Sequence, residues 1–181
     1  LEALSGPLLS LLTLAAGVAV RRAITQASGL MPELKWPNDV MVGRRKLAGI
    51  LAEGVGFGGA APTVVLGTGV NVRNAAHAGD IAVRATSLEA ELGREVERGV
   101  VLEELLVELP DEYDRLRRGK ADDILRAWRQ AAPSAAGAAV EWTTADGVRR
   151  GTTAGIDESG ALLVRTPAGT ERLVAGEVRW A

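Results

Sequence analysis

The sequence contains no cysteine and a single histidine, His77, in 181 residues. Without cysteine the chain has no disulfide, no thiolate metal site and no thiol nucleophile, which fits the reducing cytoplasm where we expect it. One histidine provides no histidine cluster for zinc and argues against a Ser-His-Asp triad. His77 falls in an irregular polar segment, and we assign it no role.

A strong charge of one sign and a long hydrophobic run are also missing. The formal net charge of −2 gives no general attraction to nucleic acid or to an anionic membrane, so we expect neither as a partner. Residues 8–20 are apolar, but a membrane-spanning helix needs about 20 such residues. Ser10 and Gly17 also interrupt the run. We interpret it as a buried helix that begins near Pro7 and ends near Gly29.

The composition that is present, with 47% hydrophobic and 24% charged residues, suits one domain with a small appendage. We predict an α/β (α+β) fold, a mixed sheet flanked by helices, in residues 1–132. Pro133–Gly137 changes the pattern from helical to strand-like. Residues 135–181 then read as a small all-β domain of short strands separated by glycine turns.

Helices are expected over residues 87–93, 102–118 and 121–132. Ser87 can cap the first of them and Gly93 can end it. In the second helix, Pro110 predicts a kink or two abutting helices. The residues expected on the inward face of this helix are Leu102, Leu105, Leu106, Leu109, Tyr113 and Leu116. Its charges, Glu112 among them, are expected on the solvated face.

The stretch Lys35-Trp36-Pro37-Asn38-Asp39 is the centre of the chain's organisation. Residues 34–36 and 40–42 read as strands, with a bend at residues 37–39 because proline fixes φ and Asn and Asp form turns. Residues 46–53 and 64–72 read as further strands, joined by a glycine-rich hairpin connection at residues 54–62. Glycines inside these strands indicate a bulge or a close approach by a ligand.

The polar residues near these strands are suited to holding anions. The candidates are Lys35, Asn38, Asp39, Lys46 and Asn71, with backbone exposed at Gly49, Gly67 and Gly69. A carboxylate such as that of Asp39 can position Mg²⁺ through its oxygens. Such a site acts by placement and charge stabilisation, so nucleotidyl transfer is chemically reasonable.

K-W-P-N-D, K-L-A-G-I-L and G-T-G-V-N, in this order and spacing, resemble the catalytic domain of bacterial biotin protein ligases. These enzymes join biotin to ATP and pass it to one lysine of the biotin carboxyl carrier domain of acetyl-CoA carboxylase. The resemblance implies ATP, biotin and Mg²⁺ as cofactors and Lys46 as the catalytic residue between the biotin carboxylate and the α-phosphate. It assigns Gly49, Gly67 and Gly69 to the biotin rings.

By the same resemblance, Asn38, Asp39 and Asn71 face the nucleotide and its metal, with Lys35 beside them. Trp36 serves either the site or the core. The tail resembles the SH3-like C-terminal domain of the same ligases, a small β-barrel.

The resemblance begins partway into the family's catalytic domain. The family's Ser/Thr-bearing segment and glycine- and arginine-rich loop, which precede K-W-P-N-D, are not matched. The chain also starts at Leu1 rather than methionine, so we expect an N-terminally incomplete ligase. The alternative is a catalytically impaired fragment that is at most a ligand-binding remnant. A lipoate-attaching enzyme of the same fold is a further alternative, which K-W-P-N-D disfavours.

Overall fold

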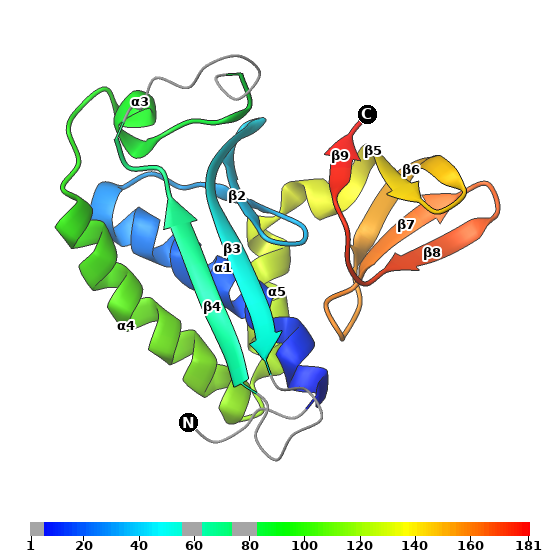
Figure 1. The fold of residues 1–181 in the computed structure, drawn as a ribbon, viewed down its shortest axis with the longest axis horizontal. Coiled ribbons are helices and arrows are strands. Elements are labelled where there is room, and N and C mark those ends of the chain that lie inside the picture. Colours follow the sequence, from blue (N-terminus) through cyan, green and yellow to red (C-terminus); the bar gives the residue numbers. More distant parts are fainter. Residues whose placement is uncertain (1–5, 56–62, 74–82) are drawn as a thin grey trace.

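The structure, a computed structural model, describes residues 6–55, 63–73 and 83–181. His77 and most of the predicted connection at residues 54–62 lie outside these ranges. In chain order the elements are α1 (Gly6–Ser28), β1 (Glu33–Lys35), β2 (Asp39–Val42), β3 (Arg45–Val55), β4 (Thr63–Val70), α3 (Leu88–Leu92), α4 (Arg98–Arg117), α5 (Ala121–Ala131), η1 (Pro133–Ala135), β5 (Ala136–Thr144), β6 (Gly147–Ile156), β7 (Leu162–Thr166), β8 (Gly169–Leu173) and β9 (Val178–Trp180) (Figure 1).

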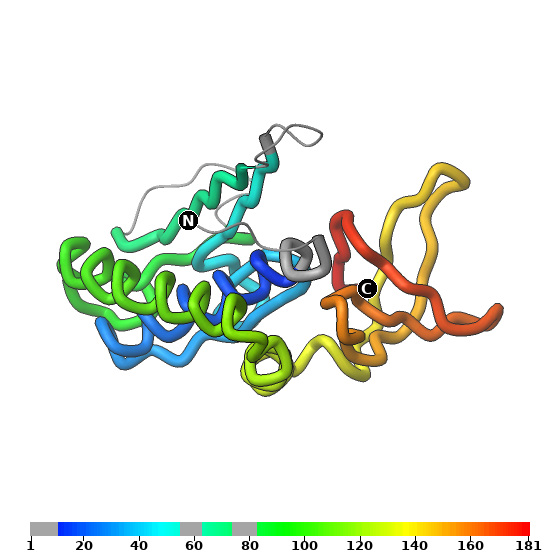
Figure 2. Tube along the Cα trace, turned by 90° about the horizontal axis from the view of Figure 1, so that it is seen from below, coloured from blue at the N-terminus to red at the C-terminus, as the bar shows by residue number. Residues whose placement is uncertain are grey.

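The first sheet has the strand order β1-β2-β3-β4, and each neighbouring pair is antiparallel. An isolated parallel bridge also joins Lys46 to Ala85. Helices α1, α4 and α5 lie together on one side of this sheet (Figure 2). On its other face Leu51 and Val65 are more than half exposed. The sheet is therefore covered by helices on one face, and its open face carries the odd-numbered residues of β4.

Helix α1 is the central element of the core. It packs against α4, α5 and the strands β1, β2 and β3. Because it has neighbours on several sides, it is buried almost all round, as a continuously apolar helix should be. The buried residues of α1 are Leu11, Leu12, Leu14, Ala15, Ala16, Val18, Ala19, Val20, Ala23 and Ile24. None of the helices within the described ranges is long and apolar enough to cross a membrane.

The predicted helix signals near residue 90 are confirmed. The Ser87 hydroxyl accepts a hydrogen bond from the backbone N–H of Ala90, and Gly93 ends α3 with a φ of 65°. Helix α4 continues through Pro110 as one element. The alternative of two abutting helices was therefore wrong.

The predicted inward face of α4 was partly wrong. Leu105 and Leu116 are buried as expected, but Leu102 and Leu106 are 53% and 65% exposed. Glu112, expected in solvent, is 1% exposed. The reason is geometric, since residues advance by about 100° around a helix. The buried stripe runs through residues 105, 112 and 116, and residues 102 and 106 lie to one side of this stripe, where they are exposed. The stripe that faces α1 therefore includes a carboxylate.

The C-terminal strands form a second antiparallel sheet with the order β8-β7-β6-β5-β9. Strands β8 and β9 are its two edges, and no pairing joins them in residues 83–181, which are described without a gap. The predicted fold class, α/β followed by a small β-rich part, is confirmed, with an open sheet in place of a closed barrel. The division at residues 132 and 135 stays a prediction.

Candidate active site

The turn between β1 and β2 places Lys35 opposite Asp39. These two residues are register partners in the antiparallel pair, so their side chains lie on the same face. Lys35 Nζ lies 3.6 Å from Asp39 Oδ2. The Trp36–Pro37 peptide bond is cis. Trp36 points the other way, into the core, where it is 5% exposed.

Lys46 at the start of β3 meets the same carboxylate. Its Nζ forms an ion pair with Asp39 Oδ1. Gly49 pairs with Asp39 in the ladder, and a Cβ on Gly49 would lie 2.9 Å from both Cε and Nζ of Lys46. The lysine side chain therefore lies over Gly49, in space that any larger residue would fill. The carboxylate of Asp39 is held between two ammonium groups.

These residues line a cleft of about 870 Å³ between the first sheet and the last strand, β9. Six of the predicted site residues line it together: Lys35, Asp39, Lys46, Gly49, Gly69 and Asn71. Other lining residues were missed from the sequence: Arg44, Arg84, Glu177, Arg179 and Trp180. Glu177, Arg179 and Trp180 have no local signal in the sequence, because they lie here only after the C-terminal strands have packed beside the first sheet. Arg44 and Arg84 come instead from the turn before β3 and from the segment before α3.

The cleft has an excess of positive charge, with five cationic side chains and two carboxylates. Lys35 Nζ lies 5.4 Å from the centre of the Trp180 ring, and Arg44 Cζ lies 5.7 Å from it, both within cation–π range. A hydrogen bond from Arg179 lowers the pKa of Glu177, and the charges of Lys35 and Arg84 contribute to this lowering. The site is therefore suited to anionic ligands such as phosphate and carboxylate groups.

Asn71 has a structural task as well. Its backbone N–H donates to Leu47 O over 3.0 Å, and its side-chain Nδ2 donates to Thr86 O over 3.0 Å. Its carbonyl oxygen accepts from the N–H of Leu88. Asn71 thus joins the end of β4 to the segment before α3 while it lines the cleft. Its predicted contact with the nucleotide stays a prediction.

Two predicted site residues do not line this cleft. Asn38 donates from Nδ2 to Ile50 O over 2.7 Å and faces a smaller cavity of about 380 Å³ on the other side of the turn. Gly67 pairs with Leu51 on the open face of the sheet. Their assignments to the nucleotide and to biotin stay predictions, without support from the cleft.

Asp39 does not fit a magnesium ligand in this arrangement. Both of its oxygens face ammonium groups, which compete with a cation for the same lone pairs. Within the described ranges no three His, Cys, Asp or Glu side chains come close enough to hold a metal ion. We therefore derive no step of the reaction through a metal on Asp39.

The fold and the cationic cleft are suited to a protein that binds small anions. Residues 3–71 match the biotin/lipoate A/B protein ligase family, and residues 137–179 match the biotin protein ligase C terminal domain. The chain is 35% identical over 170 residues to the biotin--[acetyl-CoA-carboxylase] ligase of Paracoccus denitrificans, covering 92% of this chain and 66% of that protein. It is 29% identical over 169 residues to the bifunctional ligase/repressor BirA of Bacillus subtilis, covering 92% of this chain and 52% of that protein.

Among solved structures, the biotin protein ligase from Aquifex aeolicus in complex with biotin and ATP superimposes with a TM-score of 0.82. The sequences are 24% identical, and the match covers 94% of this chain and 71% of that one. This likeness shows a shared fold. The chain belongs to the biotin protein ligase family, which confirms the resemblance of its motifs. It spans about half the length of the Bacillus relative.

Proposed function

We propose that the protein catalyses the ATP-dependent attachment of biotin to a lysine of a carrier domain, through biotinyl-5′-adenylate. The observation that carries the proposal is the pair of ammonium groups, Lys35 and Lys46, held on one carboxylate in a cationic cleft. The family and its relatives support it. The carrier that we propose is the biotin carboxyl carrier domain of acetyl-CoA carboxylase, as in the name of the Paracoccus relative.

The first half-reaction must bring two anions together. An oxygen of the biotin carboxylate attacks the α-phosphorus of ATP, and the bond to pyrophosphate breaks, giving the acyl adenylate. Lys46, 47% exposed toward the cleft, can neutralise both reacting groups, with Lys35 beside it. Asp39 holds the ammonium groups in place before the substrates arrive, which reduces the reorganisation that the reaction requires.

In the second half-reaction, the neutral amine of the carrier lysine attacks the acyl carbon. The bond to AMP breaks and a proton is released, leaving an amide. We propose that this takes place in the cytoplasm, where ATP and the carrier are available. The Bacillus relative is also named a repressor. For this chain, with its net charge of −2, we propose the ligase reaction alone.

Lys46→Ala tests this proposal. In the natural full-length protein the variant should lose biotin-dependent ATP–pyrophosphate exchange by more than a hundredfold, since a lost transition-state donor costs about 3 kcal/mol. Its melting temperature should change little, because the side chain is half exposed. Arg45→Ala is the matched control, since the neighbouring Arg45 pairs with Glu91 and does not line the cleft.

Two results would contradict the proposal. Full exchange by Lys46→Ala would show that Lys46 has no part in the chemistry. If the unaltered protein showed no exchange and no biotin transfer to a carrier domain, the result would favour the ligand-binding remnant instead.

A further inference from the structure

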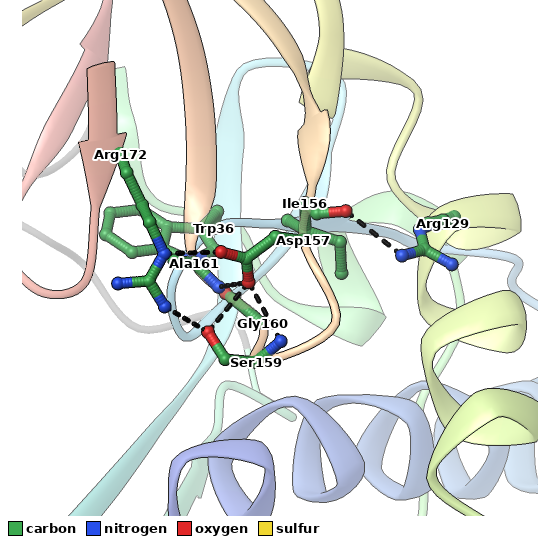
Figure 3. Close-up of polar contacts among 8 residues, drawn as sticks. All are labelled: Trp36, Arg129, Ile156, Asp157, Ser159, Gly160, Ala161 and Arg172. Carbon is green, nitrogen blue, oxygen red and sulfur yellow. Dashed lines mark hydrogen bonds and ion pairs between the residues drawn. The ribbon is translucent and has the colours of Figure 1, made fainter. Parts of the chain in front are cut away.

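The loop between β6 and β7 is built around one carboxylate, that of Asp157. Its Oδ1 accepts hydrogen bonds from the backbone N–H of Ser159 over 2.9 Å, from the Ser159 hydroxyl over 2.7 Å and from the backbone N–H of Ala161 over 3.0 Å. The loop also closes on itself through Asp157 N to Ala161 O and Gly160 N to Asp157 O. Hydrogen bonds therefore tie Asp157 to Ser159, Gly160 and Ala161, and Figure 3 shows the contacts of its side chain.

Arg172 from β8 holds this loop from outside. Its Nε donates to Asp157 Oδ2 and its Nη2 to the Ser159 hydroxyl. Partial burial alone would raise the pKa of Asp157, but the hydrogen bonds from Ser159, Arg172 and Ala161 outweigh it and lower the pKa to about 2. Asp157 is therefore charged at neutral pH and is the centre of the network in Figure 3.

The loop contacts the first half of the molecule at the turn of the proposed site. The carbonyl oxygen of Gly160 accepts a hydrogen bond from Trp36 Nε1 over 3.0 Å. Gly160 also lies against α1, where an added Cβ would come within 2.7 Å of Leu14 and 3.0 Å of Leu11. Just before the loop, at the end of β6, the carbonyl oxygen of Ile156 accepts a hydrogen bond from Arg129 of α5 over 3.0 Å. The loop is thus held by α1 and α5 as well as by Trp36.

We propose that Asp157 is a positioning residue for the turn that carries Lys35 and Asp39. Asp157 fixes the Gly160 carbonyl, and that carbonyl fixes the indole of Trp36 in the middle of the turn. Trp36 lies on the core side while its neighbour Lys35 lies on the cleft side. Because the indole is buried, a displacement of the ring would also displace the backbone of residue 36, which is bonded to Lys35. The role in ligand binding rests on the proposed function; the link from Asp157 to Trp36 does not.

The test follows the indole N–H of Trp36 by nuclear magnetic resonance, with its signal assigned by Trp36→Phe. In Asp157→Ala the exchange of this proton with solvent should quicken by about tenfold or more, because its acceptor is no longer held in place. Asp146→Ala is the matched control, since Asp146 is also paired with an arginine, Arg149, but lies 83% exposed in another turn of the same sheet. This control should leave the exchange unchanged.

Arg172→Met provides a second variant that keeps Asp157 and its backbone hydrogen bonds. It should quicken the exchange of the Trp36 proton less than Asp157→Ala does, and it keeps the test decisive if Asp157→Ala does not fold. Unchanged exchange at Trp36 in both variants, or in Arg172→Met alone when it is the only folded one, would overturn the proposal. The indole signals of Trp128 and Trp142 report whether a change is general.

The effect on the site is measured as the dissociation constant for ATP in the same variants. Asp157→Ala should raise it by about tenfold, as expected for a displaced binding residue. If Asp157 only stabilised the C-terminal strands, the melting temperature would fall while the Trp36 proton and the dissociation constant stayed the same, which would overturn the proposal. If the unaltered protein does not bind ATP, the proposed function fails, whereas the exchange at Trp36 still tests the positioning.

Discussion

Gly49 and Gly69 are partners in the β3–β4 ladder, but they lack side chains for different reasons. At Gly49 the free space is occupied by the end of the Lys46 side chain. At Gly69 nothing lies within 4 Å of an added Cβ, and the residue is not among the glycines with a positive φ. Backbone strain therefore does not require glycine at position 69. Its open face lines the cleft, so we propose that the absence of a side chain leaves room there for a ligand.

Gly69→Val should accordingly fold normally and fail to bind. Valine favours strands within a scale of about 1 kcal/mol, so the melting temperature without ligand should stay the same or rise slightly. The rise in melting temperature on adding biotin should disappear, because two methyl groups enter the cleft. Thermal melting with and without biotin measures both effects.

Thr63→Val is the control for that experiment, since Thr63 lies on the same strand at the end away from the cleft. It should keep the full ligand-induced rise. An equal rise in Gly69→Val and in the unaltered protein would remove Gly69 from the site.

Asp157 gives a second prediction for a single residue, with a defined pH range. Its pKa is lowered from 3.8 to about 2, so its charged form stabilises the folded protein. That contribution is fully present above about pH 4 and is lost as the pH falls toward 2. The difference in melting temperature between the unaltered protein and Asp157→Asn should therefore be constant from pH 7 to 5 and shrink between pH 4 and 2. A difference that is the same at pH 2.5 and at pH 6 would contradict the assigned pKa.

At the scale of elements, α1 and α4 meet through a buried ion pair. Arg22 donates to Glu112, whose side chain is 2% exposed, and Arg115 lies 3.7 Å from the same oxygen. Burial raises the pKa of Glu112, while the charges of Arg22 and Arg115 act in the opposite direction. The desolvated carboxylate thus depends on its arginine partners to remain charged in the helix interface.

Arg22→Ala should destabilise the protein by about 3 kcal/mol, because it removes the hydrogen-bonded partner of a buried carboxylate and leaves it with Arg115 at 3.7 Å. The double variant Arg22→Met with Glu112→Leu should recover most of this loss, since apolar side chains of similar volume need no counter-charge. Urea unfolding of the two variants and the unaltered protein measures the effect. A loss below about 1 kcal/mol in Arg22→Ala would show that Arg115 alone compensates for the charge.

The same elements show how much of the fold and of the site could be predicted from the sequence. The strands were predicted to within about two residues at most ends, because alternation and turn residues are local signals. The three sequence motifs predicted six of the residues that line the cleft. They could do so because the motifs lie on neighbouring strands of one sheet, which brings their side chains close together. The inward face of α4 was misjudged, because burial of Glu112 depends on Arg22, a residue 90 positions away. For the same reason Trp180 and Arg179 were missed, as their place depends on how the two sheets pack.

At the scale of the whole molecule, two hydrogen bonds among the described residues join the C-terminal sheet to the rest. Arg129 of α5 binds Ile156, and Trp36 binds Gly160. Strand β9 then completes the cleft with Trp180 over Lys35 and Arg44. The packing of the two parts therefore contributes to the site itself, and the cleft needs residues from both.

Gly160→Ala tests how strongly this packing stabilises the molecule. Gly160 has a φ of +82°, and its added methyl group would press on the buried side chains of Leu11 and Leu14. Gly137→Ala is the matched control, because Gly137 has nearly the same φ, +83°, with nothing within 4 Å of an added Cβ. Both variants should lose about 1 kcal/mol from left-handed backbone strain. Gly160→Ala should lose about 2 kcal/mol more from overpacking against α1. Urea unfolding measures the two losses, and equal losses would show that the contact between the loop and α1 is loose enough to absorb a methyl group.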